Sequence, residues 1–390
     1  MKAAAQAVDA DQVVRFARAL ISAPSENPGG TEDAAAAIAT EILDGLEASP
    51  RTIRSAAGRP NVVGYIGSAN RPTLAWNGHL DVVPAGSPEA WSCDPWAGTV
   101  QGGKLVGRGA ADMKGPMAAA LAAGAALRRA GIPLAGTLVF HLVADEELAG
   151  AHGTRVLRDA GLLDQDACVV GEPSGLQLAL VQRGGAWIVA TARGSAAHGS
   201  RPELGVNAIT SMARFLLRLH EVLPDVRHPL AGRPSVNVAL ISGGSAPNVV
   251  PDRCSVDIDR RVIPGERDPQ LVLAPFRELA ADLRRERPEI DIEIEMREWT
   301  DAAEAPADSA IGVIARESVA AETGRAPPDV GFTGITDARF YLNELRIPTI
   351  VLGPGSLEVA HTADEWIRVD ELVVAARVYA RIFAEFLGRW

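Results

Sequence analysis

The 390-residue sequence predicts an α/β fold, in which a larger domain with a mainly parallel, helix-covered sheet carries an inserted, smaller α+β domain. Three observations support this prediction. The first part of the chain alternates helical patterns with short apolar runs, which are typical of strands buried on both faces. The middle part has strands in which apolar and polar residues alternate, as in a sheet with one exposed face. A last apolar run near the C-terminus returns the chain to the larger domain.

The larger domain is expected to begin with two helices. Residues 11–21 place their apolar side chains on one helical face, and Pro24 ends that segment. Residues 31–46 form the second helix. The apolar runs that predict buried strands are 61–66, 73–76, 137–143, 167–170 and 348–352.

The inserted domain is expected to follow the order strand–helix–strand–strand–helix–strand. Its predicted strands are 187–192, 235–241, 254–260 and 290–296, and its predicted helices are 205–222 and 268–285. We therefore divide the chain into a larger domain of residues 1–179 and 297–390 and an insertion of residues 180–296.

Composition excludes several classes of protein. A net charge of −11 argues against nucleic-acid binding, which depends on Lys and Arg at phosphates. The longest apolar run, residues 117–127, is much shorter than the ~20 residues that span a bilayer, and no secretory signal is seen. Cys93, Cys168 and Cys254 are widely separated, so we expect free thiols and a cytoplasmic protein without nucleic-acid or membrane partners.

Chemically useful side chains follow the predicted strands of the larger domain. In open α/β sheets, ligands bind outside the carboxyl ends of the strands. Four strands deliver His or Glu residues to this edge, and the glycine-rich segment 107–115 adds an aspartate. The candidates are His79, the pair Glu146 and Glu147, Glu172, His361 and Asp112.

Two histidines with several carboxylates and no cysteine are typical of hydrolytic Zn, Co or Mn centres. Five ligands, one from each of the four strand ends and one from the segment 107–115, exceed the need of one catalytic zinc ion. If one carboxylate bridges, however, they suit two metals about 3.5–4 Å apart. Asp81 stands two residues after His79 on an extended segment, where it can hold the second imidazole nitrogen.

The motifs around these residues resemble the M20 metallopeptidase family, in particular its acetylornithine deacetylase and succinyl-diaminopimelate desuccinylase group. The segments that carry the resemblance are Asn77-Gly78-His79-Leu80-Asp81-Val82-Val83-Pro84, Gly107-Arg108-Gly109-Ala110-Ala111-Asp112-Met113-Lys114-Gly115, Asp145-Glu146-Glu147 and Gly171-Glu172-Pro173. They occur in the right order and cover nearly the whole chain. The resemblance implies a catalytic domain with two metal ions, expected to be Zn with Co or Mn as alternatives, and an inserted dimerisation domain.

Carried over position by position, the resemblance implies a role for each candidate. His79, Asp112 and Glu172 would hold one metal, and the bridging Asp112 would hold the second with Glu147 and His361. Glu146 would be the general base and Asp81 the partner of His79. The segment 359–365 keeps the histidine and a following acidic residue but has Ala where Asn is common.

The inserted domain carries further resemblances. His198, in the segment 194–199, matches the histidine that reaches the partner subunit's active site and helps to hold the tetrahedral intermediate. Asn248 and Arg261 match substrate-binding positions, with Arg261 as a clamp for a carboxylate. Arg183 and Arg339 are additional substrate-binding candidates. A homodimer formed through residues 180–296 is implied.

The resulting interpretation is a two-metal amidohydrolase that cleaves an N-acyl amino acid, with Glu146 taking the proton of the attacking water. A metallocarboxypeptidase or dipeptidase acting on a short peptide uses the same chemistry and remains an alternative. A metal-free binding module that kept the fold is an alternative from another class. A serine hydrolase would need G-x-S-x-G, and a dinucleotide enzyme would need a third glycine after Gly107 and Gly109.

Overall fold

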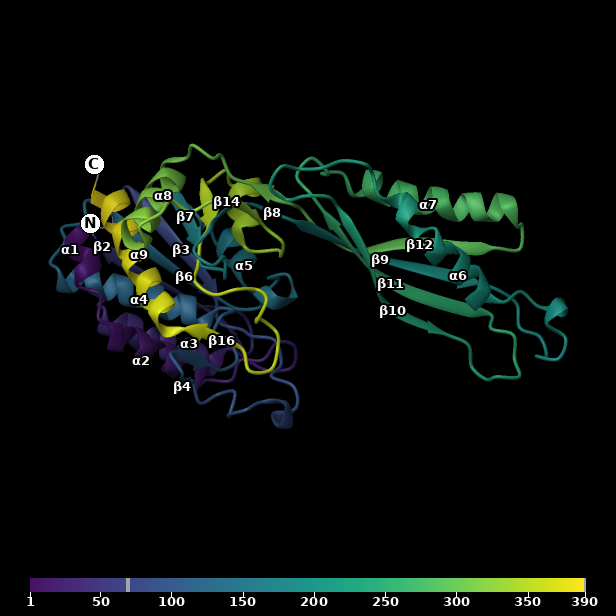
Figure 1. The fold of residues 1–390 in the computed structure, drawn as a ribbon, viewed down its shortest axis with the longest axis horizontal. Coiled ribbons are helices and arrows are strands. Elements are labelled where there is room, and N and C mark those ends of the chain that lie inside the picture. The colour runs from purple at the N-terminus through teal and green to yellow at the C-terminus, as the bar shows by residue number, and fades with distance from the viewer. Residues whose placement is uncertain (68–70, 389–390) are drawn as a thin grey trace. The chain divides into compact units, whose positions relative to one another are not determined.

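The computed structural model describes residues 1–67 and 71–388 and separates into two compact units, whose elements are labelled in Figure 1. The first unit comprises Met1–Leu180, Ala305–Phe332 and Thr336–Trp390, and the second comprises Val181–Glu304 and Thr333–Ile335. The second unit ends later than the 296 expected from the sequence. The reason is that its last long strand continues to Thr300 and a two-residue strand follows it.

The larger sheet, most of whose strands belong to the first unit, has the strand order β1-β2-β6-β3-β7-β15-β8-β13, and β14 pairs with β8. The strands are β1 (Arg51–Ala56), β2 (Arg59–Gly67), β3 (Thr73–His79), β6 (Thr137–Val143), β7 (Ala167–Val170), β8 (Leu178–Gln182), β13 (Ala303–Glu304), β14 (Asp329–Phe332) and β15 (Thr349–Val351). The central strands β6, β3, β7 and β15 are parallel. Antiparallel pairing occurs toward the edges, between β1, β2 and β6 and between β15 and β8. The predicted α/β class is confirmed.

Helices flank this sheet (Figure 1). They are α1 (Lys2–Gln6), α2 (Ala10–Ile21), α3 (Asp33–Gly45), α4 (Lys114–Arg129), α5 (Thr154–Asp159), α8 (Ala310–Thr323) and α9 (Val369–Gly388). The alanine-rich α4 is buried along most of its length because small side chains let it pack closely against α2 and α9. Across residues 1–67 and 71–388, no helix is both long and apolar enough to cross a membrane.

A small antiparallel sheet brings two distant segments of the first unit together. It consists of β4 (Thr99–Gln101), β5 (Lys104–Val106) and β16 (Trp366–Arg368), in the order β16-β5-β4. Trp366 pairs with Val106, and Arg368 pairs with Lys104. The chain that follows His361 therefore lies beside the chain that leads to Asp112.

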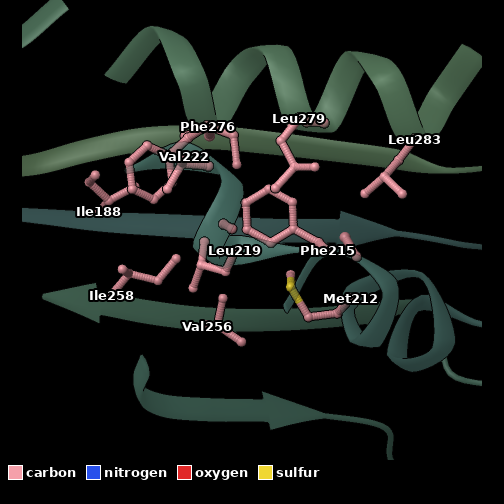
Figure 2. Packing of buried hydrophobic residues seen from close by; sticks show 14 of the residues in the cluster. Ile188, Met212, Phe215, Leu219, Val222, Val256, Ile258, Phe276, Leu279 and Leu283 are labelled. Carbon is pink, nitrogen blue, oxygen red and sulfur yellow. The ribbon is translucent and has the colours of Figure 1, made fainter. Parts of the chain in front are cut away.

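The second unit has an antiparallel sheet in the order β10-β11-β9-β12. Its elements are β9 (Gly184–Arg193), β10 (Ser235–Gly243), β11 (Arg253–Val262), β12 (Asp291–Thr300), α6 (Ala208–Leu217) and α7 (Pro269–Glu286). Figure 2 shows the core between the helices and one face of the sheet, where Phe215 and Phe276 meet Ile188 and Ile258. The predicted helix 205–222 is shorter because the Asn207 side chain caps α6 at Thr210, and a 3₁₀ turn, Leu219–Val222, follows.

Candidate metal centre

The carboxyl ends of the parallel strands place the acidic and histidine side chains at one edge of the first unit's sheet. His79 is the last residue of β3. Glu146 and Glu147 lie in a 3₁₀ turn (Glu146–Leu148) after β6, and Glu172 follows β7. Since β6, β3 and β7 are parallel neighbours, these ends meet at the same edge.

Three donors meet around His79. Its Nε2 lies 3.2 Å from Oδ1 of Asp112 and 3.8 Å from Oε1 of Glu172. All three side chains are almost fully buried. We call this the first donor group.

A second donor group forms around His361. Its Nε2 lies 3.3 Å from Oδ2 of Asp112 and 3.2 Å from Oε2 of Glu147. Asp112 thus offers one oxygen to each group. The His361 side chain remains 50% exposed, so this group is open to solvent on one side.

The spacing of the donors fits divalent metal ions. Ligands about 2.1 Å from a tetrahedral metal lie about 3.4 Å from one another. The distances from Nε2 of His79 and Nε2 of His361 to the carboxylate oxygens of their groups are 3.2–3.8 Å, which is close to that value. Within residues 1–67 and 71–388, the buried Oε1 of Glu147 has no hydrogen-bond partner, which leaves it available as a further donor. The residues present therefore fit two metal ions that share Asp112.

The charges of the two groups also favour cations. Burial alone would lower the pKa of His79, but Asp112 and Glu172 outweigh it and hold this pKa well above its ordinary range. Hydrogen bonds that His361 donates to the carboxylates of Asp112 and Glu147 raise its pKa to about 10. Burial raises the pKa of Glu172 well above its usual value and also raises that of Glu147. The close packing of these carboxylates therefore favours the binding of cations between them.

Asp81 holds the turn that carries the glutamate pair. The Nδ1 of His79 lies 2.8 Å from the main-chain oxygen of Asp81 and 3.6 Å from its carboxylate. A carbonyl can only accept, so this bond places the proton of neutral His79 on Nδ1 and leaves Nε2 free for a metal. The Asp81 carboxylate accepts hydrogen bonds from the main-chain N–H groups of Glu146 and Glu147. Its position therefore fixes that turn more directly than it fixes the imidazole.

The main chain of Glu146 is held in place by Asp81, and burial changes the acidity of its side chain. Burial raises the pKa of its carboxyl group well above the usual range, although His79 opposes the shift. A carboxylate with a raised pKa is a better proton acceptor near neutral pH. Glu146 thus has the property that a general base requires.

A buried polar chain beneath the turn was not predicted from the sequence. Asn27 donates 2.9 Å to Asp81 and 3.0 Å to Asp145, and its own oxygen accepts from Arg59. Arg59 in turn donates a hydrogen bond to Oε1 of Glu32, whose side chain is fully buried. Asn27 lies 54 and 118 residues from its two acceptors, so no local pattern could have identified it.

Arg339 and Arg183 use their guanidinium groups on the main chain. Arg339 is buried and donates 2.9 Å to the carbonyl of Thr336 and 2.9 Å to that of Ala149, just after the glutamate turn. Arg183 donates through Nε and Nη2 to the carbonyl of Ala231. These bonds give both residues a structural task that the sequence did not indicate.

The remaining candidates lie in the second unit. His198 is exposed, and its Nδ1 accepts a hydrogen bond from the main-chain N–H of Ser200. The next residue, Gly199, donates 2.7 Å to the main-chain oxygen of Asn248, so His198 and Asn248 lie on adjacent segments. Arg261, on β11, forms an ion pair of 3.0 Å with Asp259.

Comparisons with known proteins agree with this architecture. A family model described as peptidase family M20/M25/M40 matches residues 75–385. An acetylornithine deacetylase from Myxococcus xanthus is 34% identical over 326 residues, which are 82% of either chain. A succinyl-diaminopimelate desuccinylase from Cereibacter sphaeroides is 31% identical over 345 residues, covering 85% of this chain and 88% of the relative.

Solved structures share the fold over nearly the full length. An M20 family metallo-carboxypeptidase from Sulfolobus solfataricus has a TM-score of 0.80 at 18% identity, with 97% of this chain and 100% of the other covered. Human carnosine dipeptidase 1 has a TM-score of 0.79 at 18% identity, with coverage of 99% and 98%. These structures are similar to the present chain in architecture.

Proposed function

The chain belongs to peptidase family M20/M25/M40, which makes it a metal-dependent amidohydrolase, and on this premise we propose that it hydrolyses the amide bond of an N-acyl amino acid with two metal ions. One observation carries the two-metal assignment. The carboxylate of Asp112 offers Oδ1 to the donor group of His79 and Oδ2 to that of His361. The acyl-amino-acid assignment is supported by the deacetylase and desuccinylase relatives, whose identity to this chain exceeds 30%.

Each side chain has a defined task in the proposed reaction. Bound divalent ions, Zn with Co or Mn as alternatives, would activate a water molecule and polarise the scissile carbonyl. Glu146 accepts the proton of the attacking water and returns it to the leaving amine. Asp81 keeps Glu146 in place through the main chain of the turn.

We assign substrate recognition to the second unit. Arg261 is proposed to bind the substrate carboxylate, since a guanidinium group matches a carboxylate with two parallel hydrogen bonds. His198 is proposed to donate a hydrogen bond to the oxyanion. The Ser200 N–H that points at Nδ1 supports this role, because the neutral ring then carries its proton on Nε2.

We further propose a cytoplasmic homodimer formed through the second unit. β10 lies at the edge of its sheet, and its Leu240 and Ile241 side chains are 65% and 61% exposed. An exposed apolar edge strand favours pairing with another chain. The three cysteines are free, as suits a reducing compartment.

An activity screen tests the substrate class. The zinc-loaded protein is assayed against N-acetyl, N-succinyl and N-carbamoyl amino acids and against dipeptides. We expect the highest kcat/KM for an N-acyl amino acid. A clear preference for dipeptides would replace the proposal with the peptidase alternative.

The Glu146→Gln variant tests the mechanism. Metal content should remain near that of the wild type, while kcat falls by about 10²–10⁴ because the general base is lost. Glu147→Gln is the matched control, since it changes a proposed ligand and should lower the metal content. If Glu146→Gln loses metal and Glu147→Gln retains it, the two roles are reversed.

Complementation tests the trans action of His198. Inactive His198→Ala and Glu146→Gln proteins are mixed and allowed to exchange subunits. A mixed dimer has one site with its own Glu146 and a His198 from the partner, so part of the activity should return. If subunits exchange without recovery, His198 does not act across the dimer.

A further inference from the structure

Glu365 is a fully buried carboxylate that accepts four hydrogen bonds from one short segment. Its Oε2 accepts from Nη1 of Arg108 at 2.7 Å and from the main-chain N–H of Gly109 at 3.0 Å. Its Oε1 accepts from the main-chain N–H groups of Ala111 at 2.8 Å and Asp112 at 2.9 Å. Both oxygens are therefore fully used by the segment that ends at the bridging aspartate.

The same residue belongs to the segment that carries His361. Only three residues separate His361 from Glu365, and the main-chain oxygen of Glu365 accepts from the N–H of Gly107 at 2.9 Å. Directly after Glu365, β16 pairs with β5. Glu365 thus joins two parts of the chain that lie about 250 residues apart, each of which supplies a donor to the second group.

We propose that Glu365 is a positioning residue that sets the distance between His361 and Asp112 and thereby the metal affinity of the second donor group. The inference rests on the proposed two-metal function. The second group depends on Glu365 through two of its donors, His361 and Asp112. The first group depends on Glu365 through Asp112 alone. Its other two donors belong to other segments, since His79 ends β3 and Glu172 follows β7. The two sites should therefore respond unequally when Glu365 is changed.

The arrangement of the four donors around Glu365 makes Glu365→Gln a suitable test. Glu365→Gln keeps the size of the side chain but replaces one acceptor oxygen by an NH₂ group. Since each oxygen of Glu365 faces two donors, the amide must turn its NH₂ group toward one donor pair in either orientation. The variant therefore loosens the segment 108–112 without opening a cavity.

Zinc titration of the metal-free protein, with a chromophoric chelator as competitor, is the main measurement. For Glu365→Gln we expect the weaker of the two zinc affinities to fall by about 10–100-fold, the range found when partners of metal ligands are altered. The stronger affinity should change much less. Thermal unfolding of the metal-free variant shows separately whether the fold is kept.

Glu322→Gln is the matched control. Glu322 forms a partly buried ion pair with Arg381 between α8 and α9, and it contacts neither donor group. The control should lose stability without a change in either zinc affinity. Glu365→Asp, which keeps the charge beside Arg108, provides a second variant if Glu365→Gln does not fold, and it too should weaken the second zinc ion because the shorter side chain cannot reach both donor pairs.

The outcomes separate this inference from the proposed function. If the wild type binds fewer than two zinc ions, the two-metal function fails. If the wild type binds two ions and the folded Glu365 variants bind both with unchanged affinity, or lose both affinities equally, the positioning role of Glu365 is refuted while the two-metal function stands.

Discussion

Replacing Glu32 by glutamine should make the stability of the protein less dependent on pH. The Glu32 side chain is fully buried, its Oε1 pairs with Arg59, and its Oε2 has no hydrogen-bond partner in the described part of the chain. Burial, with the nearby charge of Asp81, raises its pKa from 4.5 to about 7. Arg59 lowers this pKa but does not cancel the effect of burial.

The direction in which stability changes with pH follows from the number of protons bound by the folded and the unfolded protein. Between pH 4.5 and about 7, Glu32 keeps its proton in the folded protein and loses it in the unfolded chain. The folded state thus binds more protons, so stability falls as the pH rises through this window and then levels off. The full difference between the two pKa values corresponds to about 3 kcal/mol.

Urea unfolding of the metal-free protein at several pH values between about 5 and 8 measures this effect. The wild type should lose stability as the pH rises over this range, whereas Glu32→Gln should not, because glutamine does not ionise. The free energy of unfolding of Glu32→Gln, relative to that of the wild type, should therefore increase by about 2–3 kcal/mol from the lowest to the highest pH. Glu41→Gln, at an exposed position of α3, controls for the substitution itself. Parallel pH profiles for wild type and Glu32→Gln would refute the reasoning.

Three further predictions concern the site. Asp112→Ala should bring the metal content of the purified protein from two ions toward none, since both donor groups lose a ligand; full metal content with full activity would contradict the bridge. Arg339→Lys should lower kcat by about 10²-fold with little change in KM, because the main chain at Ala149 shifts near Glu146. Arg261→Lys should instead raise KM by about 10–100-fold at nearly constant kcat, as expected for loss of a carboxylate clamp. Steady-state kinetics distinguish the Arg339→Lys and Arg261→Lys variants. If Arg339→Lys raised KM and Arg261→Lys lowered kcat, the roles assigned to the two residues would be reversed.

The sheet and its acidic edge could be predicted because their signals are local in the sequence. Strands β3, β6 and β7 are short apolar runs, and each ends next to His79, the glutamate turn or Glu172. Parallel strands bring such ends together without any knowledge of side-chain contacts. The strand ends were therefore enough to suggest that His79, the glutamate pair and Glu172 meet.

The supporting contacts could not be predicted because their partners are distant and mostly belong to the main chain. Asp81 was expected to hold the second imidazole nitrogen of His79, and its main-chain oxygen lies 2.8 Å from that nitrogen. The hydrogen bonds that its carboxylate accepts from the N–H groups of the glutamate turn were not foreseen. Arg339 was expected to bind substrate, and its hydrogen bond to the carbonyl of Ala149, 190 residues away, was not foreseen. Main-chain N–H and C=O groups are present at every position, so a sequence does not show which of them a side chain binds.

The order of strands in the sheet has a consequence for the newly made chain. β15 lies between β7 and β8, although nearly all of the second unit is synthesised after β8 and before β15. The first donor group is complete once Glu172 has been made, whereas the second needs His361, about 190 residues later. At ~5–20 residues per second, this interval lasts ~10–40 s.

During that interval, the growing chain contains the residues of the first donor group but lacks His361 and the inner strand β15. The facing edges of β7 and β8 present N–H and C=O groups that have no strand between them, and such edges pair readily with wrong partners. For the two metal ions proposed above, the ligands of the first donor group are thus made about 190 residues before the last ligand of the second.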